Sequence, residues 1–372
     1  MTINKNLSYH TILSFSSILF LLFPAALIAG PFVSELFLII ISLLFLYLII
    51  NQKDYEILSN KFVKWFLLFL LILLVSLIQT DDFKLSLKPS LTYFRFGLFS
   101  LAIFFILKNK IKVIEYFYFF LIITLLVLMI DGYYQYFHPF GLNTLGYQLE
   151  RPDRLGGLFF EELILGSFIS KILPIFLTFT FLNKKLFFTK FKLLNFFSKY
   201  LTLLFIIFLY ILIFLSGERA AFILTTFYFI LILPFLIDYK KVIIIVTLFI
   251  ISFYGIIKSN ENLKDRYFDQ VIRHTFNIYK KEGVSNFLIM PQHIGMFTAA
   301  IDIFKKNILI GSGVKTFRKN CKYVDEKKTL KLKEIKSNII FCSTHPHNYY
   351  FQLLAETGFI GFSYVMVIFF IL

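Results

Sequence analysis

The sequence predicts an all-α integral membrane protein with about ten transmembrane helices. The chain has 372 residues, of which 58% are hydrophobic and 16% charged, and its mean hydropathy is +0.78. Long apolar runs such as Leu36–Ile50, Trp65–Ile78 and Tyr200–Leu215 approach the length that crosses a hydrocarbon core of about 30 Å. This composition excludes a soluble globular fold.

Hydropathy predicts spans that follow one another with short connections in all but one place. They are residues 11–29, 32–50, 65–80, 91–107, 116–134, 161–182, 200–215, 219–237, 242–257 and 349–372. The chain is thereby divided into transmembrane helices 1–9 (1–257), a long loop (258–345) and a tenth helix (346–372). Because the chain ends at Leu372 inside an apolar run, we expect either a truncated sequence or a missing C-terminal pair of helices.

The basic residues predict the orientation, because Lys and Arg in short loops stay on the cytoplasmic side of a membrane. Lysine is concentrated in the N-terminal segment and in the loops 51–64, 108–115, 183–199 and 238–241. We therefore expect these segments to be cytoplasmic and residues 258–345 to lie outside. The net charge of +16 then reflects topology, and the expected partner is the lipid bilayer and not nucleic acid.

The outer loop 258–345 contains a predicted amphipathic helix followed by a lysine-rich stretch. Its apolar residues recur at three- and four-residue spacing, and Gly311–Gly313 ends the pattern; they are Ile294, Phe297, Ile301 and Phe304. Such a helix suits the membrane surface or the end of a helix bundle. Residues 322–338 are rich in lysine and are typical of a solvated loop.

Both cysteines of the chain, Cys321 and Cys342, fall in the outer loop. An oxidising compartment on that side favours a disulfide between them, which would stabilise the fold by about 3 kcal/mol in the chain-entropy model. The alternative is two free thiols.

The seven arginines are distributed differently from the lysines, because none of them lies in a loop expected to be cytoplasmic. They are Arg95, Arg151, Arg154, Arg219, Arg266, Arg273 and Arg318. A guanidinium group binds phosphate and carboxylate through two parallel hydrogen bonds, which lysine does not. We expect an anionic ligand on the outer side, of which a lipid-linked diphosphate is a natural example; chance and loop composition are the alternative explanation.

Arg219 is the most constrained of the arginines. It follows Ser216-Gly217-Glu218 in a turn of a few residues between two predicted spans. The guanidinium group is therefore expected at the outer end of the bundle in a rigid position, which suits catalysis. The alternative is an Arg219 that reaches to the membrane interface and pairs with Glu218.

A second concentration of functional side chains, Thr344-His345-Pro346-His347-Asn348, stands where the outer loop re-enters the membrane. Pro346 disfavours helix at His345, so the last helix is expected to begin at or just after the proline, with His347 in its first turn. A neutral imidazole with a pKa near 6.5 can act as a general base. No third metal ligand stands at a useful spacing, so no metal is expected; two structural histidines at a helix end are the alternative.

These residues form part of a longer pattern. The stretch 347–361 resembles the motif of bacterial O-antigen ligases and the related O-antigen polymerases. It consists of His347-Asn348, nine further residues and Gly358-Phe359-Ile360-Gly361. Phe362 stands where the family usually has Thr or Val. Other parts are also similar to the family: Arg219 ahead of a span, Gly311-x-Gly313 before Phe317-Arg318, and the run Arg154–Phe159. Members of the family typically have about twelve spans.

The resemblance implies glycan transfer at the periplasmic face of a bacterial inner membrane, without metal or cofactor. The donor would be a glycan on undecaprenyl diphosphate and the acceptor a sugar hydroxyl of lipid A–core. His347 would act as general base and Arg219 would stabilise the diphosphate. Further substrate contacts would come from Arg154, Arg151, Asn348, His345, Glu161 and Arg318.

Three other functions remain open from the sequence. Within the family, the chain could be a polymerase that extends lipid-linked glycans or an oligosaccharyltransferase that modifies a protein. In a different class, a transporter or flippase would carry ionisable residues near the bilayer midplane. Here Lys171 is the main deep charge, and Arg95, Asp131, Glu161 and Glu218 lie toward the outer ends of the spans. Polar chemistry on one side favours an enzyme.

Overall fold

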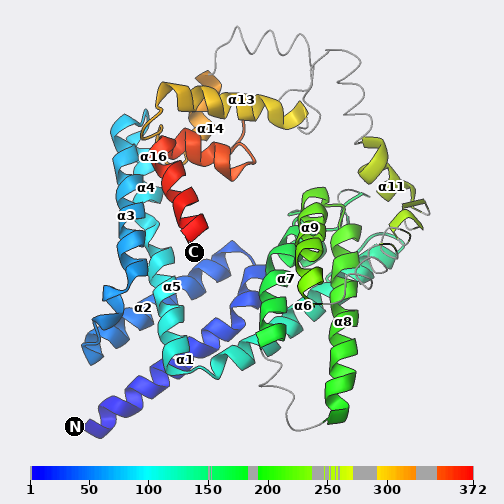
Figure 1. The fold of residues 1–372 in the computed structure, drawn as a ribbon, viewed down its shortest axis with the longest axis horizontal. Coiled ribbons are helices and arrows are strands. Elements are labelled where there is room, and N and C mark those ends of the chain that lie inside the picture. The colour runs from blue at the N-terminus through cyan, green and yellow to red at the C-terminus, as the bar shows by residue number, and fades with distance from the viewer. Residues whose placement is uncertain are drawn as a thin grey trace. The chain divides into compact units, whose positions relative to one another are not determined.

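A computed structural model describes most of the chain. The described residues are 2–149, 151, 153–182, 192–236, 247, 251, 253–255, 257–258, 260–270, 291–323 and 342–371. Within these residues the chain forms helices and no strand, and the β pairing there is an isolated antiparallel bridge between Leu142 and Gln148. The predicted all-α class is confirmed (Figure 1). Most of the lysine-rich stretch 322–338 lies outside the described residues.

Polar side chains mark the starts of some of the helices. The side chains of Asn60 and Asp82 cap two of them, by accepting hydrogen bonds from the N–H groups of Phe62 and Leu85. The bounds are α1 Thr2–Ile28, α2 Pro31–Gln52, α3 Lys61–Val75, α4 Phe83–Thr92, α5 Phe94–Asn109, α6 Val113–Phe137, α7 Leu165–Leu182, α8 Lys192–Leu215, α9 Arg219–Leu236, α11 Glu261–Lys264, α13 Pro291–Lys306, α14 Phe317–Asn320 and α16 Tyr349–Ile371.

Six helical stretches in the described residues are long and apolar enough to cross a membrane. They are Ser8–Ile28, Pro31–Gln52, Lys61–Gln79, Phe83–Asn109, Val113–Phe137 and Tyr349–Ile371, and each coincides with a predicted span. Three shorter apolar helices, Leu165–Thr180, Leu201–Leu215 and Arg219–Ile232, coincide with three further predictions. The predicted span 242–257 lies largely outside the described residues, so the total of about ten is not confirmed.

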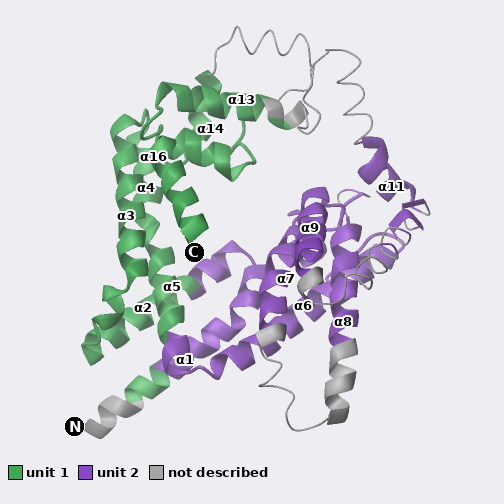
Figure 2. Cartoon of the chain, viewed as in Figure 1, with its two compact units in different colours: residues 1–12, 38–105, 272–372 green, residues 13–37, 106–271 purple. Residues whose placement is uncertain are grey.

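The chain divides into two compact units (Figure 2). Unit 1 comprises residues 1–12, 38–105 and 272–372, and unit 2 comprises residues 13–37 and 106–271. In unit 2, helices α6, α7, α8 and α9 pack against one another. Their facing sides bury a continuous apolar core that includes Leu125, Leu165, Ile169, Leu209, Leu212 and Phe214.

Helix α13 of unit 1 packs against α16, which confirms the amphipathic helix but corrects its buried face (Figure 1). The predicted stripe is only partly covered, since Ile301 is 37% exposed. The buried hydrophobic side chains of α13 are instead those of Met296, Ala299, Ala300 and Ile303. Small alanine side chains allow the two helices to approach closely, and hydropathy alone undervalues them.

Helix α16 is broken at Gly358, where φ is 67° and ψ is −167°. Figure 1 shows its two halves meeting at an angle. Such a break leaves backbone groups unpaired on both sides. On the first side, the carbonyl of Ala355 accepts from the N–H of Ser312 at 3.0 Å. The carbonyl of Glu356 likewise accepts from the N–H of Gly313 at 2.9 Å.

The second side of the break is satisfied by the same loop. The N–H of Phe359 donates to the carbonyl of Ile308 at 2.8 Å. The N–H of Ile360 donates to the carbonyl of Leu309 at 3.1 Å. The loop after α13 therefore replaces the helical hydrogen bonds that α16 gives up.

Two glycines make this crossing of backbones sterically feasible. The φ angle is +74° at Gly311 and +67° at Gly358. A Cβ atom on Gly311 would lie 2.5 Å from the backbone nitrogen of Gly358, and a Cβ atom on Gly358 would lie 2.5 Å from the backbone nitrogen of Gly311. Gly311 and Gly358 thus serve one backbone contact within unit 1.

Candidate functional site

Four arginines gather around Asp153 on unit 2. Arg151 makes two parallel hydrogen bonds to the Asp153 carboxylate, from Nε at 3.1 Å and from the terminal nitrogen at 3.0 Å. A terminal nitrogen of Arg266 lies 3.5 Å from the same carboxylate. The carboxylate is therefore shared by two guanidinium groups, and both can still bind another anion.

Arg219 and Arg266 are tied to each other through the backbone. The Nε of Arg266 donates to the carbonyl of Gly217 at 3.0 Å, and a terminal nitrogen of Arg219 donates to the carbonyl of Arg266 at 3.3 Å. Gly217 has a φ of +70°, and a side chain there would collide with the carbonyl of Asp153. The turn between α8 and α9 is thus held against two other segments, as expected for a rigid Arg219.

Arg154 completes the cluster from the loop after Asp153. One terminal nitrogen of Arg154 donates to the carbonyl of Leu163 at 2.5 Å. Its Nε is buried and has no hydrogen-bond partner in the part of the chain that the structure describes. A buried donor without a partner is costly, so this group favours an acceptor such as a phosphate oxygen.

The arginines affect one another electrostatically. Burial lowers the pKa of Arg266, and the positive charge of Arg219 lowers it further, while the negative charge of Asp153 raises it. Arg154 and Arg151 add to the repulsion. An anion that neutralises the cluster would relieve this repulsion.

Glu218, the residue before Arg219, contacts the start of α7. Its Oε1 accepts hydrogen bonds from the backbone N–H groups of Gly166 at 2.7 Å and Ser167 at 3.2 Å. Its Oε2 accepts from the Ser167 hydroxyl. The carboxylate therefore caps the N-terminal end of α7, which fixes the residue before Arg219 in place.

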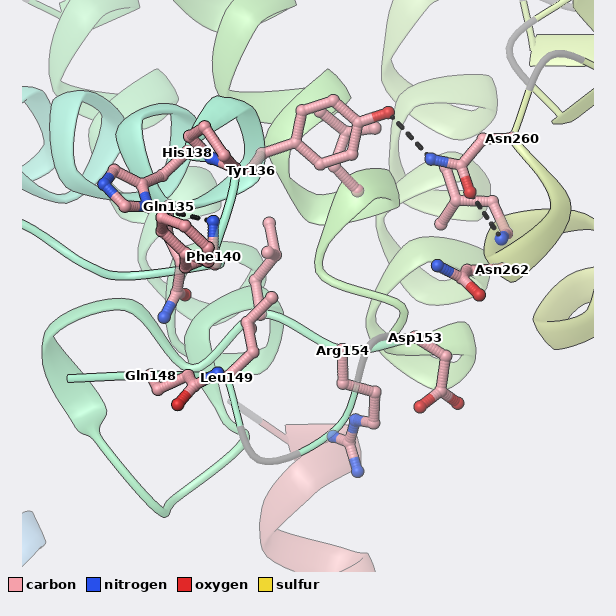
Figure 3. Close-up of a pocket in the computed structure, with 15 residues that line it drawn as sticks. Gln135, Tyr136, His138, Phe140, Gln148, Leu149, Asp153, Arg154, Asn260 and Asn262 are labelled. Carbon is pink, nitrogen blue, oxygen red and sulfur yellow. Dashed lines mark hydrogen bonds between the residues drawn. The ribbon is translucent and has the colours of Figure 1, made fainter.

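A pocket of about 430 Å³ adjoins the arginine cluster in unit 2 (Figure 3). Asp153 and Arg154 belong to both the pocket wall and the cluster. The remaining wall comes from the end of α6, the loop that follows it, the end of α8 and the start of α11. It is formed by Gln135, Tyr136, His138, Pro139, Phe140, Gly141, Gln148, Leu149, Leu155, Leu215, Asn260, Asn262 and Leu263.

Three histidines lie together on unit 1. The ring centroids of His345 and His347 are 4.3 Å apart, and those of His293 and His347 are 5.5 Å apart. The Nδ1 of His345 lies 2.9 Å from the hydroxyl oxygen of Thr344. His347 has a φ of +54°, a left-handed conformation that is uncommon for a residue with a side chain. Such strain is typical of functional positions.

Helix α16 begins later than predicted, and this places His347 ahead of the helix. Its first residue is Tyr349, and the Oδ1 of Asn348 accepts the N–H groups of Tyr350 at 2.9 Å and Phe351 at 3.3 Å. Asn348 therefore caps α16. The left-handed turn at His347 precedes the cap and directs the imidazole toward the other two histidines.

The environment of His347 favours the neutral imidazole. Partial burial lowers its pKa below the ordinary value of 6.5, and the neighbouring His345 and His293 lower it further. Burial also lowers the pKa of His293, whose Nδ1 has no hydrogen-bond partner among the described residues. A neutral imidazole at pH 7 can accept a proton, as a general base requires.

Residues 203–366 match the family model described as O-antigen ligase (Wzy_C). This segment is similar to the O-antigen ligase family. The predicted resemblance is thus confirmed, and the match supports an O-antigen ligase-like, glycan-handling function in general. Searches of curated proteins and of solved structures find no match.

The segment that matches the family model contains parts of both clusters. Arg219, Arg266, His293 and His347 lie within residues 203–366, whereas Arg151 and Arg154 precede it. The sequence pattern did not single out Arg266 or His293. Both are far along the chain from the residues they accompany, and neither belongs to a short motif. The segregation of arginine to the outer segments was the one signal that included Arg266.

Two other residues that the O-antigen ligase resemblance implicated, Glu161 and Arg318, are exposed. Glu161 is exposed in the turn before α7 and does not line the pocket. Arg318 is exposed on α14 of unit 1.

A disulfide joins Cys321 to Cys342, whose Cα atoms lie 5.1 Å apart. Among the described residues, no group of three His, Cys, Asp or Glu side chains is arranged as metal ligands.

Proposed function

We propose that the chain transfers a glycan from an undecaprenyl-diphosphate carrier to a sugar hydroxyl of lipid A–core at the periplasmic face of the inner membrane. The observation that carries this proposal is the arginine cluster around Asp153. A cluster of guanidinium groups suits a ligand with several anionic oxygens, and a diphosphate has this chemistry. The match to O-antigen ligases supports a glycan as the group that the diphosphate carries.

In the proposed reaction, the bond between the anomeric carbon and the diphosphate oxygen breaks as a bond from the acceptor oxygen forms. Negative charge then develops on the leaving diphosphate. Arg219 and Arg266 are held by backbone carbonyls, so their guanidinium groups need little rearrangement to stabilise this charge. Arg154 and Arg151 contribute further positive charge from the adjoining loop.

The acceptor hydroxyl loses its proton during the attack, and His347 is the proposed base. Its lowered pKa keeps the imidazole neutral at pH 7, and the left-handed backbone fixes the direction of the ring. His345 is the neighbouring group that can contact the acceptor. Attack on the face opposite the diphosphate inverts the configuration of the anomeric carbon, and no step of the proposal uses a metal or a cofactor.

Deletion of the gene in its host, followed by analysis of the surface glycan, tests the proposed function. A ligase predicts lipid-linked polymer that accumulates beside bare lipid A–core. Core that carries a single repeat unit would instead indicate a polymerase, and an unmodified protein acceptor would indicate an oligosaccharyltransferase. Unchanged glycan together with unchanged protein glycosylation would contradict a glycan transferase and leave a transporter or flippase as the better account.

A further inference from the structure

We propose that the pocket of unit 2 binds the sugar that is attached to the diphosphate, and that its carboxamide side chains determine which glycan the protein accepts. This inference rests on the proposed function and names the donor-sugar site within it. The pocket has a volume of about 430 Å³, which lies within the range of small-ligand sites. It opens beside the arginine cluster, since Asp153 and Arg154 belong to both.

Several polar groups of the wall are already engaged, and they give the pocket a fixed shape. The Oε1 of Gln135 accepts the N–H of Gly157 at 2.8 Å. The Nδ2 of Asn260 donates to the hydroxyl of Tyr136 at 3.1 Å, as Figure 3 shows. A wall held by hydrogen bonds between its own residues is preorganised, which reduces the entropy lost on binding.

Two carboxamides of the wall remain available to a ligand. Gln148 and Asn262 are exposed, and neither side chain makes a hydrogen bond within the described residues. Each carboxamide offers two donors and one acceptor, which matches the mixed donor and acceptor character of neighbouring sugar hydroxyls. They come from the loop after α6 and from α11, so a ligand would be contacted from two segments.

His138 adds a donor of defined direction. Its Nδ1 accepts hydrogen bonds from the backbone N–H groups of Phe140 at 3.2 Å and Leu142 at 3.4 Å. Because Nδ1 is the acceptor, the neutral ring carries its proton on Nε2. Phe140, which is 72% exposed, provides an aromatic surface that suits the C–H face of a sugar ring.

The composition of the wall distinguishes a sugar from other ligands. A second phosphate would require several cations, and Arg154 is the one cation among the residues that line the pocket. A lipid chain would require a mostly apolar wall, whereas here amide, imidazole and carboxylate groups alternate with apolar residues. The sugar of the donor is linked directly to the diphosphate, so a sugar site has to adjoin the diphosphate site, as this pocket adjoins the arginine cluster.

The test measures binding of two lipids to the full chain in nanodiscs: undecaprenyl diphosphate alone, and the glycan-bearing carrier isolated from the deletion strain. Gln148→Ala and Asn262→Ala are each expected to weaken binding of the glycan-bearing carrier by about 3- to 10-fold, the effect of one lost hydrogen bond. Binding of undecaprenyl diphosphate alone should not change. Gln52→Ala, an exposed glutamine of unit 1, is the matched control and should affect neither lipid.

The outcomes separate this inference from the proposed function. If wild-type protein binds both lipids but the two variants bind the glycan-bearing carrier normally, the sugar site is wrong and the proposed function stands. Equal weakening for both lipids, or weakening only of lipid A–core binding in a parallel measurement, also overturns the donor-sugar site. If wild-type protein binds neither diphosphate lipid, the proposed function itself fails.

Discussion

The imidazole of His293 on α13 lies against that of His347 ahead of α16, with ring centroids 5.5 Å apart and ring planes at 55°. His345, which precedes Pro346 in the sequence, also lies against the ring of His347, with ring centroids 4.3 Å apart. His347 is therefore flanked by two groups that become cations in acid. Their charge, added to partial burial, disfavours protonation of His347.

This arrangement predicts the pH dependence of glycan transfer. A general base acts in its neutral form, so the rate should rise with pH through a midpoint below 6.5, the ordinary pKa of histidine. In His293→Gln, one potential cation is removed, so the pKa of His347 rises and the midpoint moves to higher pH. The rate at pH 8 should hardly change, because His347 is neutral there in both proteins. The measurement is a pH–rate profile, with His10→Gln as the control; a midpoint that shifts downward would contradict the account.

The crossing of Gly311 and Gly358 predicts a large loss of stability when either gains a side chain. Both residues have positive φ, and an added Cβ atom would lie 2.4 Å from the nearest backbone atom. Positive φ alone costs roughly 1–3 kcal/mol, so Gly358→Ala should lower the unfolding free energy by at least that amount. Thermal unfolding of the detergent-solubilised chain measures the effect.

Gly255→Ala is the matched control for that measurement. Among the described residues, a Cβ atom on Gly255 would meet nothing within 4 Å, and alanine favours helix more than glycine does. The control should be neutral or slightly stabilising. A Gly358→Ala protein as stable as wild type would show that the two backbones do not meet as described.

The contacts of Arg266 predict that lysine cannot replace it in glycan transfer. Its Nε donates to the carbonyl of Gly217 while another nitrogen approaches Asp153, and lysine has no second fixed donor to make both contacts. Arg266→Gln should lower kcat/KM at least 10-fold, and Arg266→Lys should recover little of it. Lys264→Gln, on the exposed surface of neighbouring α11, tests the effect of charge alone. Full recovery by lysine would mean that Arg266 contributes only its charge.

The disulfide between Cys321 and Cys342 predicts that the thermal stability of the chain depends on redox conditions. The bridge spans a sequence separation of 21 residues, for which the chain-entropy model gives a stabilisation of about 3 kcal/mol. The double variant Cys321→Ser/Cys342→Ser should therefore lower the melting temperature, and a reducing agent should do the same to wild type but not to the variant. Non-reducing mass spectrometry checks the pairing directly; two thiols that both react with an alkylating agent would refute it.

The fold class could be predicted from the sequence because it depends on local composition. Apolar runs long enough to span a bilayer predicted the helices from Ser8 to Phe137 and from Tyr349 to Ile371. The buried face of α13 was assigned wrongly, because Ala299 and Ala300 pack closely without adding much hydropathy. The start of α16 was also misplaced, since the Asn348 cap defines it and not Pro346.

The candidate site was predictable only where its residues belong to a short pattern. Arg219 and His347 stand in such patterns, a tight turn and a His-Asn motif. Arg266 contacts Arg219, and His293 contacts His347, through tertiary contacts between segments that are distant in sequence. No local periodicity encodes those contacts. The pocket is likewise assembled from separate segments, so residues such as Gln148 carried no signal by themselves.

Glycan transfer by the purified full chain tests the central claim most directly. The assay supplies the glycan-bearing undecaprenyl-diphosphate carrier and lipid A–core to protein in nanodiscs, with EDTA present. Wild-type protein should form glycan-bearing core and release undecaprenyl diphosphate. His347→Ala should lower kcat by about 10²- to 10⁴-fold, the range for loss of a general base, while its binding of the donor stays close to that of wild type. Absence of product with wild-type protein, or a His347→Ala protein with the full rate, would contradict the account.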